Sequence, residues 1–307
     1  MNATSAEPAS KATPDDRRAR RARADRERIE PRAPRLGLEG VPRHWFANSR
    51  AATQLANGVN LLFPAGERFF IRSVRHYLDR VSPELAAQVK GFFGQEGRHA
   101  QAHERLFDTL RAQGFDVDTL LERYEALAYG VIEKKVPHKL SLAVTVALEH
   151  FTALLAEDAL TTDELANAHP EVRRLLEWHA VEELEHKAVA FDVLEEIDPG
   201  YALRILGMIV ATLTLGGFWM WATHELLKQD GSSLWEGMRE LRELRKRAPE
   251  STSKSATSVF ARGIREYIRP RFHPMDRDHS TLIADTLARL EREGVVVSKV
   301  AEARGAS

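Results

Sequence analysis

An E-x-x-H step occurs twice in this chain of 307 residues, and each copy follows a single glutamate at the distance of one helical hairpin. The intervals are 29 positions before the first step and 34 before the second. At about 1.5 Å per residue, each interval lets one helix run away from a point, turn and return to the same level. The order E…ExxH…E…ExxH is how a four-helix bundle holds two metal ions in its core. The residues are Glu67, Glu96 with His99, Glu149, and Glu183 with His186.

Composition excludes several other kinds of site. The chain has 44 basic and 45 acidic residues and a formal charge of −1, so it has no overall field for nucleic acid, and we expect no nucleic-acid partner. It has no cysteine, which excludes disulfides, thiolate metal sites and a cysteine nucleophile. Residues 1–35 are rich in arginine and lack an apolar run, so we expect a disordered basic arm rather than a secretory signal. A cytoplasmic location is expected, with membrane association as an alternative.

From residue 42 onward the apolar residues recur at helical spacing, and strand-like alternation is nearly absent. We predict an all-α fold, a four-helix bundle with an additional apolar fifth helix and a helical C-terminal tail. Pro64 should kink or restart the first helical region. The predicted helical regions are 44–80, 82–113, 138–160, 170–198 and 201–227. The predicted division of the chain is a basic arm (1–35), a dinuclear metal domain (42–230, including the apolar helix 201–227), a charged segment and linker (231–258) and a small tail (259–307).

Each predicted bundle helix places a glutamate in the middle of its apolar stripe. In the second helix, for example, Val89 and Phe92 precede Glu96, and Leu106 follows it on the same face. An unpaired buried carboxylate costs on the order of several kcal/mol, so four of them need compensation. Core arginines do not supply it, because Arg98 and Arg174 fall off these stripes. Two divalent cations would balance four carboxylates, and neutral histidines would complete the coordination.

Other polar residues lie on or beside the same stripes. His179 stands four positions before Glu183, and we favour a third imidazole ligand over a hydrogen-bonded core histidine. His103 and Glu182 are expected behind the ligands as hydrogen-bond partners, with a pocket position for His103 and a surface position for Glu182 as alternatives. Candidates for orienting imidazoles by position alone are Asp192 and Glu157, and His150 is expected to face another helix.

The fifth apolar stretch has 19 residues without charge, from Ile205 to Thr223. This length suits a membrane span, and the clustered aromatic residues near its end suit a membrane interface. A helix that is buried or lies at an interface is favoured slightly, because glycines and threonines interrupt the stretch. In either place the helix could help to form an apolar entrance for substrate.

Four segments that contain these residues resemble the bacterial family labelled predicted metal-dependent hydrolase, and the resemblance covers roughly 42–230. The ligand order is also similar to that of ferritin-like di-iron proteins and, with the third histidine, to the di-iron arylamine N-oxygenases. This second resemblance implies seven ligands: Glu67, Glu96, His99, Glu149, His179, Glu183 and His186. The segments are 63–70, 94–100, 147–152 and 178–192.

These observations predict a dinuclear metal enzyme, with the four glutamates Glu67, Glu96, Glu149 and Glu183 as its catalytic carboxylates. The leading hypothesis is an oxygen-activating oxidase or oxygenase that holds two irons, with manganese or an iron–manganese pair as alternatives. It would act on a small or apolar substrate and need dioxygen and an electron donor. The first alternative is hydrolysis by a metal-activated water, for which zinc would serve. The second is a non-catalytic metal-binding bundle. The pattern leaves open which glutamates bridge the metals.

Overall fold

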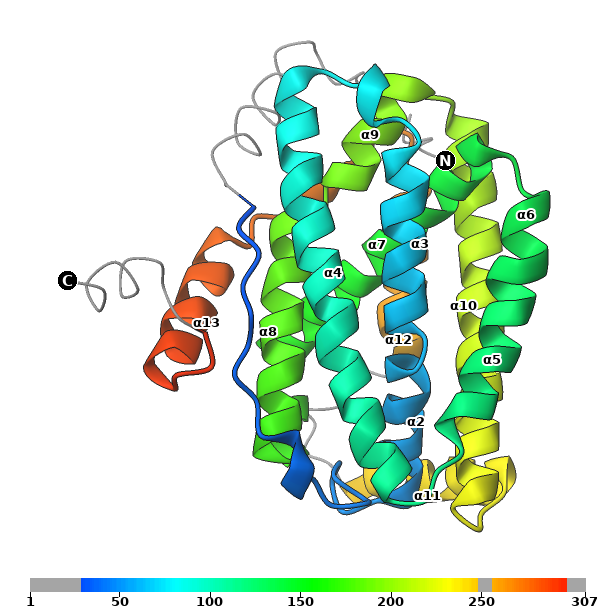
Figure 1. Ribbon diagram of the computed structural model, residues 1–307, viewed down its shortest axis with the longest axis vertical. Helices are drawn as coiled ribbons and strands as arrows, with labels where there is room; N and C mark the ends of the chain where they lie inside the picture. The colour runs from blue at the N-terminus through cyan, green and yellow to red at the C-terminus, as the bar shows by residue number, and fades with distance from the viewer. Residues whose placement is uncertain (1–28, 248–255, 297–307) are drawn as a thin grey trace, which may run out of the picture.

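The computed structural model describes residues 29–247 and 256–296 and is helical throughout (Figure 1). Within these ranges there is no β-strand, only an isolated bridge between Phe46 and Ala168. The all-α prediction is therefore confirmed for the described part of the chain. Five helices carry or support the predicted metal ligands: α2 (Arg50–Asn60), α3 (Phe63–Arg75), α4 (Pro83–Ala112), α7 (His138–Thr161) and α8 (Pro170–His186).

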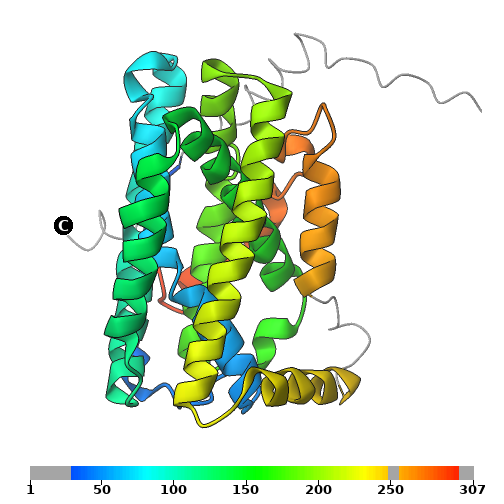
Figure 2. The same cartoon turned by 90° about the vertical axis from the view of Figure 1, so that its right-hand side faces the viewer.

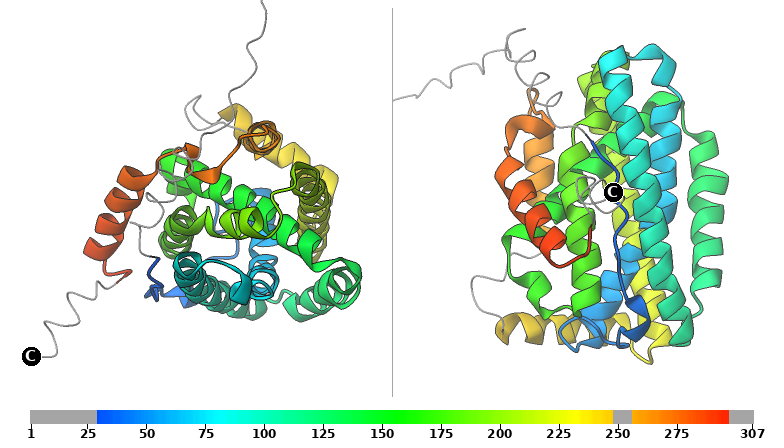
Figure 3. Two further views of the ribbon diagram at one scale, coloured as in Figure 1. Left: turned by 90° about the horizontal axis from the view of Figure 1, so that it is seen from above. Right: turned by 60° about the vertical axis from the view of Figure 1, so that its left-hand side comes forward.

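Four of these helices form a closed ring around one core. Helix α3 packs on α4 and α7, and α8 packs on the same two helices from the other side. The end-on view shows this arrangement, with the remaining helices outside it (Figure 3). Phe92 is fully buried within the ring, where the centroid of its side-chain ring lies 5.0 Å from that of the His186 imidazole. A ring of this kind brings the middle of each apolar stripe to a common centre.

Proline and glycine set several helix boundaries as expected. Pro64 lies in the first turn of α3, so the first helical region restarts there. Helix α4 ends before Gly114, which has a φ of +87°. Ser82 precedes α4, but its hydroxyl donates to Glu196 instead of capping the helix. The fourth predicted helix is wrong as a single element, because α8 ends at His186 and α9 (Val189–Ile197) follows it.

A second layer covers one side of the ring, and part of it was not predicted. Helix α10 (Tyr201–Gln229) packs on α7 and α2. Beside it lie α5 (Val117–Leu127), a π-helical turn η3 (Ala128–Ile132) and the short α6 (Glu133–Lys135), as Figure 2 shows. No helix was named for the interval 114–137 in the sequence analysis, although Asp116 accepts the amide of Thr119 as an N-cap.

The two ends of the described chain also pack on the bundle. Residues 29–37 run along the bundle and are followed by the 3-10 turn η1 (Leu38–Gly40). The disordered arm expected over 1–35 is therefore too long at its C-terminal end. Residues 1–28 lie outside the described part of the chain. Tyr267 and Phe272 belong to the main apolar cluster, and Leu290 packs beside α8. The C-terminal helices are thus joined to the bundle core. They are α11 (Leu234–Arg247), α12 (Ala256–Tyr267) and α13 (Ser280–Arg292), with the 3-10 turn η6 (Pro274–Asp276).

The contact between α10 and α7 depends on one glycine, and this can be tested. A Cβ atom at Gly207 would lie 2.4 Å from the backbone oxygen of Ala143, whereas one at Gly216 would meet nothing within 4 Å. We predict that Gly207→Ala destabilises the fold by roughly 1–3 kcal/mol, because the two helices must separate. Gly216→Ala in the same helix should stabilise it by roughly 0.5–1 kcal/mol. Urea unfolding of both variants measures this, and equal midpoints would contradict it.

Candidate metal centre

The four helices of the ring each bring one predicted glutamate to the same buried position. Glu96 is completely buried, and the other three side chains are at most 3% exposed. The histidines lie on α4 and α8 among them, and none is more than 5% exposed. The structure thus gathers all seven residues that the sequence singles out as ligands. They are Glu67 on α3, Glu96 and His99 on α4, Glu149 on α7, and His179, Glu183 and His186 on α8.

The seven side chains form two overlapping groups. The donor atoms of Glu96, Glu183 and His186 lie within 4.8 Å of one another, and Glu149 Oε2 lies 3.4 Å from His186 Nε2. On the other side, the donor atoms of Glu67, Glu96 and His99 also lie within 4.8 Å of one another. The same is true of the donor atoms of His99, His179 and Glu183. Only the two E-x-x-H glutamates, Glu96 and Glu183, occur in both groups. They stand between two candidate ion positions, while Glu67 and Glu149 stand at opposite ends.

Seven of the eight carboxylate oxygens at this centre have no hydrogen-bond partner, and the eighth, Glu183 Oε1, lies 2.9 Å from His179 Nε2. Both oxygens of Glu67, Glu96 and Glu149 are buried without a hydrogen-bond partner, as is Oε2 of Glu183. Among the described residues, no lysine or arginine forms an ion pair with any of the four carboxylates. Buried acids in this condition are strongly destabilising unless cations reach them. The donor set, four carboxylates and three imidazoles without sulfur, fits two divalent cations.

Each of the three histidines holds its second ring nitrogen against a polar group. His99 Nε2 lies 3.1 Å from Glu182 Oε2, and His186 Nδ1 lies 2.9 Å from Gln95 Oε1. His179 Nδ1 lies 2.6 Å from His103 Nε2. The opposite nitrogens point into the centre, where His99 Nδ1 and His186 Nε2 have no hydrogen-bond partner. Imidazoles that bind metals are oriented by contacts of this kind.

Arg32 connects two of these supporting groups from outside the ring. Its guanidinium donates to Glu185 at 2.7 Å and to Glu182 at 3.3 Å, and its backbone amide also donates to Glu182. Gln95 donates to the same Glu185 at 2.6 Å. Sequence reasoning missed this network, because Arg32 lies in the segment expected as a disordered arm. Gln95, which directly precedes the first E-x-x-H step, was the available signal.

The other predicted supporting residues divide into two sets. His103 and Glu182 lie directly behind ligand histidines, and His103 also contacts Asn60. The suggestion that Asp192 and Glu157 orient ligand imidazoles is wrong. Asp192 pairs with His273, and Glu157 pairs with Arg277, both in the C-terminal segment. His150 faces another helix as expected, with Nε2 lying 3.0 Å from the Gly263 backbone oxygen on α12.

Burial and mutual contact displace the acid–base equilibria of the metal-free centre. Loss of hydration raises the pKa of Glu67 and Glu96, and it raises the pKa of Glu149 to about 8. Burial opposes the charge of Glu183 as well, but the surrounding histidines hold the pKa of this carboxyl well below its usual range. Burial also opposes the charge of His99, yet its contacts with Glu182 and Glu183 raise its pKa to about 10. Without metal, the centre therefore holds protons at neutral pH.

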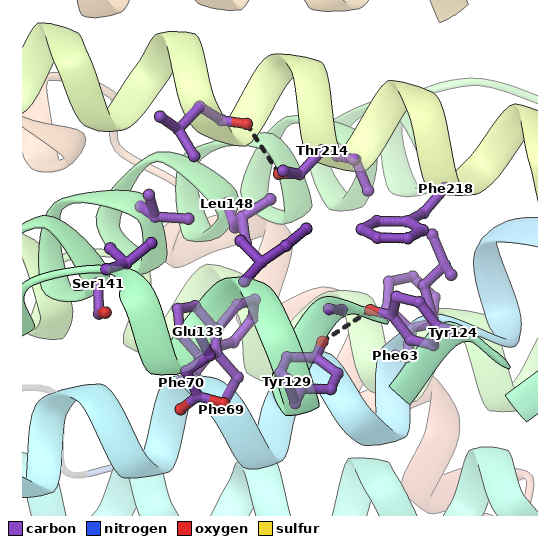
Figure 4. Close-up of a pocket in the computed structure, with 18 of the residues that line it drawn as sticks. Phe63, Phe69, Phe70, Tyr124, Tyr129, Glu133, Ser141, Leu148, Thr214 and Phe218 are labelled. Atoms are coloured by element: carbon purple, nitrogen blue, oxygen red, sulfur yellow. Dashed lines mark hydrogen bonds between the residues drawn. The ribbon is translucent and has the colours of Figure 1, made fainter. Parts of the chain in front are cut away.

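An apolar cavity of about 110 Å³ borders the centre (Figure 4). Gly66 and Phe70 line it from either side of Glu67 on α3, and Leu148 and Thr152 line it from either side of Glu149 on α7. The ring of Phe63, another lining residue, lies 4.8 Å from that of His103 and 4.9 Å from that of His179. None of the seven predicted ligands lines the cavity, but residues next to Glu67 and Glu149 do, so it lies beside the layer of predicted ligands on the side of α3 and α7. Its outer wall includes Tyr124 and Tyr129, whose hydroxyls lie 2.7 Å apart.

Metal uptake by the chelator-treated chain should release protons in a pH-dependent way. With a pKa of about 8, Glu149 is about nine-tenths protonated at pH 7 and about one-tenth protonated at pH 9. The number of protons released per chain on metal binding should therefore fall by up to about 0.8 from pH 7 to pH 9. Calorimetric titration with Mn²⁺ under nitrogen, in buffers of different ionisation enthalpy, measures the release. Glu149→Gln should remove this pH dependence. A release that rises with pH would contradict the assignment.

Comparison with known proteins bears on this site. No curated protein and no solved structure gives a significant match. The family described as predicted metal-dependent hydrolase matches residues 30–278, a range that contains all seven candidate ligands. Together with the clustered donors, this description indicates metal dependence, and it agrees with the hydrolytic alternative rather than with oxygen activation. The expected similarity to di-iron N-oxygenases is not found. The chain belongs to the predicted metal-dependent hydrolase family.

Proposed function

We propose that the chain is a dinuclear metal-dependent enzyme that acts on a small apolar substrate. The observation that carries this proposal is a set of four buried carboxylates. Seven of their eight oxygens have no hydrogen-bond partner, and no lysine or arginine of the described residues forms an ion pair with them. Stable folding requires a counter-charge at their centre, and two divalent cations supply it without a further side chain. The adjoining apolar cavity is the reason to expect catalysis rather than a purely structural role.

The residues at the centre would have different roles in holding the two ions. Glu96 and Glu183 would be shared between the two ions, and Glu67 and Glu149 would each hold one ion at the side that the cavity approaches. The three imidazoles would complete the coordination, with Glu182, Gln95 and His103 fixing their orientation. The list of proposed ligands is Glu67, Glu96, His99, Glu149, His179, Glu183 and His186.

Hydrolysis is the reaction that the family description favours. When bound, two such ions lower the pKa of a water molecule and polarise a substrate carbonyl or phosphoryl group. The apolar cavity would hold the non-reacting part of the substrate, so an ester or amide of an apolar acid is a suitable class. Burial of the centre would restrict water to the reacting position.

Oxygen activation is the second candidate, and the donor set favours it. A bundle core with one glutamate from each of two helices and an E-x-x-H step from each of the other two is the arrangement used by di-iron and di-manganese carboxylate proteins. Here those pairs are Glu67 with Glu149 and the steps on α4 and α8. This reaction would need dioxygen and an external electron donor. A non-catalytic bundle is the third candidate.

Metal content tests the ligand assignment. Protein purified without chelators should contain about two metal ions per chain, because seven donors form two groups around shared glutamates. The double variant Glu96→Ala with Glu183→Ala should lose both ions. Glu104→Ala, on the same helix α4 but paired with Arg68, is the matched control and should keep them. Elemental analysis gives the counts, and a double variant that retained two ions would defeat the assignment.

One reconstitution experiment separates the two reactions. Zinc-loaded protein under nitrogen should cleave a chromogenic ester with an apolar acyl group if the chain is a hydrolase, with loss of activity in Glu67→Ala. Iron(II)-loaded protein exposed to oxygen should instead take up dioxygen and develop a visible absorption band if it is an oxidase. Loading with two metals but neither result would leave the non-catalytic bundle as the function.

A further inference from the structure

Helix α10 presents a row of large apolar side chains to solvent. Leu206, Ile209, Leu213 and Met220 recur at spacings of three, four and seven, so they lie on one side of the helix. Each is more than 40% exposed, and Leu213 is 70% exposed. The other side of α10 packs against α7 and α2, which makes this row an unpartnered surface rather than part of the core.

Neighbouring elements extend the row into a broader patch. Leu127 at the end of α5 and Val131 in η3 are also exposed. Figure 2 shows α5 and α10 side by side on this face of the molecule. A groove between them is lined by Leu127, Leu213 and Gly217, among others. We call the surface formed by the following residues the apolar face: Leu127, Val131, Leu206, Ile209, Leu213 and Met220.

The groove on the apolar face leads into the cavity beside the metal centre. Tyr124, Ile132, Thr214 and Phe218 line both, so these residues stand at the passage from one to the other. Figure 4 shows Tyr124 and Phe218 at one end of the inner cavity, away from Phe69 and Phe70. An apolar molecule on the face would thus meet an apolar route toward Glu67 and Glu149.

The polar groups of this region suit an apolar environment bordered by anions. The hydroxyls of Thr212 and Thr214 donate to backbone oxygens four residues earlier, at 2.7 and 2.8 Å, and so need no water. Arg123 lines the groove. Lys134 and Lys135 follow Val131 at helical spacing and are exposed. Basic side chains at the edge of an apolar surface match the phosphates of a lipid layer.

In the part of the chain that the structure describes, two helices are long and apolar enough to cross a membrane, α7 and α10. Most of the apolar window of α7 is buried in the core, whereas only 22% of the α10 window is buried. A spanning helix packs against lipid or against other spanning helices, but α10 packs along one side on α2, which is not long and apolar enough to cross a membrane. The geometry is that of a helix lying on a lipid surface.

We propose that the apolar face docks on a bilayer that contains anionic lipid, and that apolar substrate reaches the metal centre from the bilayer between α5 and α10. The docking stands on the exposed residues alone. The substrate route rests on the proposed function. Docking would bring the groove against the acyl chains and place Arg123, Lys134 and Lys135 at the level of the phosphates.

Flotation of the full chain with lipid vesicles tests the docking. The protein should float with vesicles of phosphatidylcholine and phosphatidylglycerol, and roughly tenfold less with phosphatidylcholine alone. Ile209→Glu with Leu213→Glu should reduce binding to the mixed vesicles by roughly tenfold or more. Ala284→Glu with Ala288→Glu on α13 adds the same charge on the opposite side of the bundle and should leave binding unchanged (Figure 3).

Because the chain has no cysteine, single introduced cysteines report which face meets the lipid. Bimane on Leu213→Cys should be quenched by vesicles that carry nitroxide-labelled acyl chains, and bimane on Ala288→Cys should not. Failure of the unmodified chain to float, equal flotation of both double variants, or equal quenching at both sites would overturn the proposal. A different outcome would also overturn the proposal: the unmodified chain is a dimer, Leu213→Glu dissociates it, and neither form binds vesicles. The apolar face would then be the contact between two copies of the chain.

Metal analysis of the same preparations separates this inference from the proposed function. Protein that binds two metals but does not float overturns the docking, and with it the route from the bilayer, while the proposed function stands. Protein that floats but cannot acquire metal overturns the proposed function and with it the substrate route, while the docking stands.

Discussion

The structure is organised around four carboxylates that are buried together without a lysine or arginine among the described residues to neutralise them. Glu67, Glu96, Glu149 and Glu183 come from four different helices, so their mutual repulsion acts directly between the elements that form the core. Loss of hydration raises the pKa of three of them, Glu67, Glu96 and Glu149, even though neighbouring histidines act in the opposite direction. Two cations at this point would convert a repulsive core into one that joins all four helices. Folding and chemistry would then depend on the same ions.

The surroundings support that centre in successive layers. Glu182, Gln95 and His103 fix the ligand imidazoles, and Arg32 links two of these partners to the segment that runs along the bundle. On the opposite side, toward α3 and α7, the contacts become apolar and open into the cavity. The side of the centre formed by α4 and α8 is thus polar, and hydrogen bonds fix its side chains. The side from which a substrate would arrive is apolar. This asymmetry, rather than the ligand set alone, is what distinguishes a catalytic centre from a structural one.

Much of the bundle and its centre could be predicted from the sequence, because the relevant signals are local. Pro64, Pro83 and Pro170 mark helix starts, and the E-x-x-H steps carry their own helical spacing. Glu96 and Glu183 could not be assigned as the shared pair, since that depends on how four helices meet. Arg32 was missed for a related reason: its partners lie some 150 positions away, and nothing near it in the chain indicates an ordered contact. The break between α8 and α9 at Lys187 also has no local proline or glycine to mark it.

The most direct test of the account is anomalous diffraction from crystals of the full chain purified without chelators. The account predicts two anomalous peaks inside the ring, each within coordination distance of Glu96 and Glu183, with one near Glu67 and the other near Glu149. Well-ordered crystals that show the four carboxylates sharing protons with each other, with no anomalous peak between them even after soaking in Mn²⁺ or Fe²⁺, would contradict it.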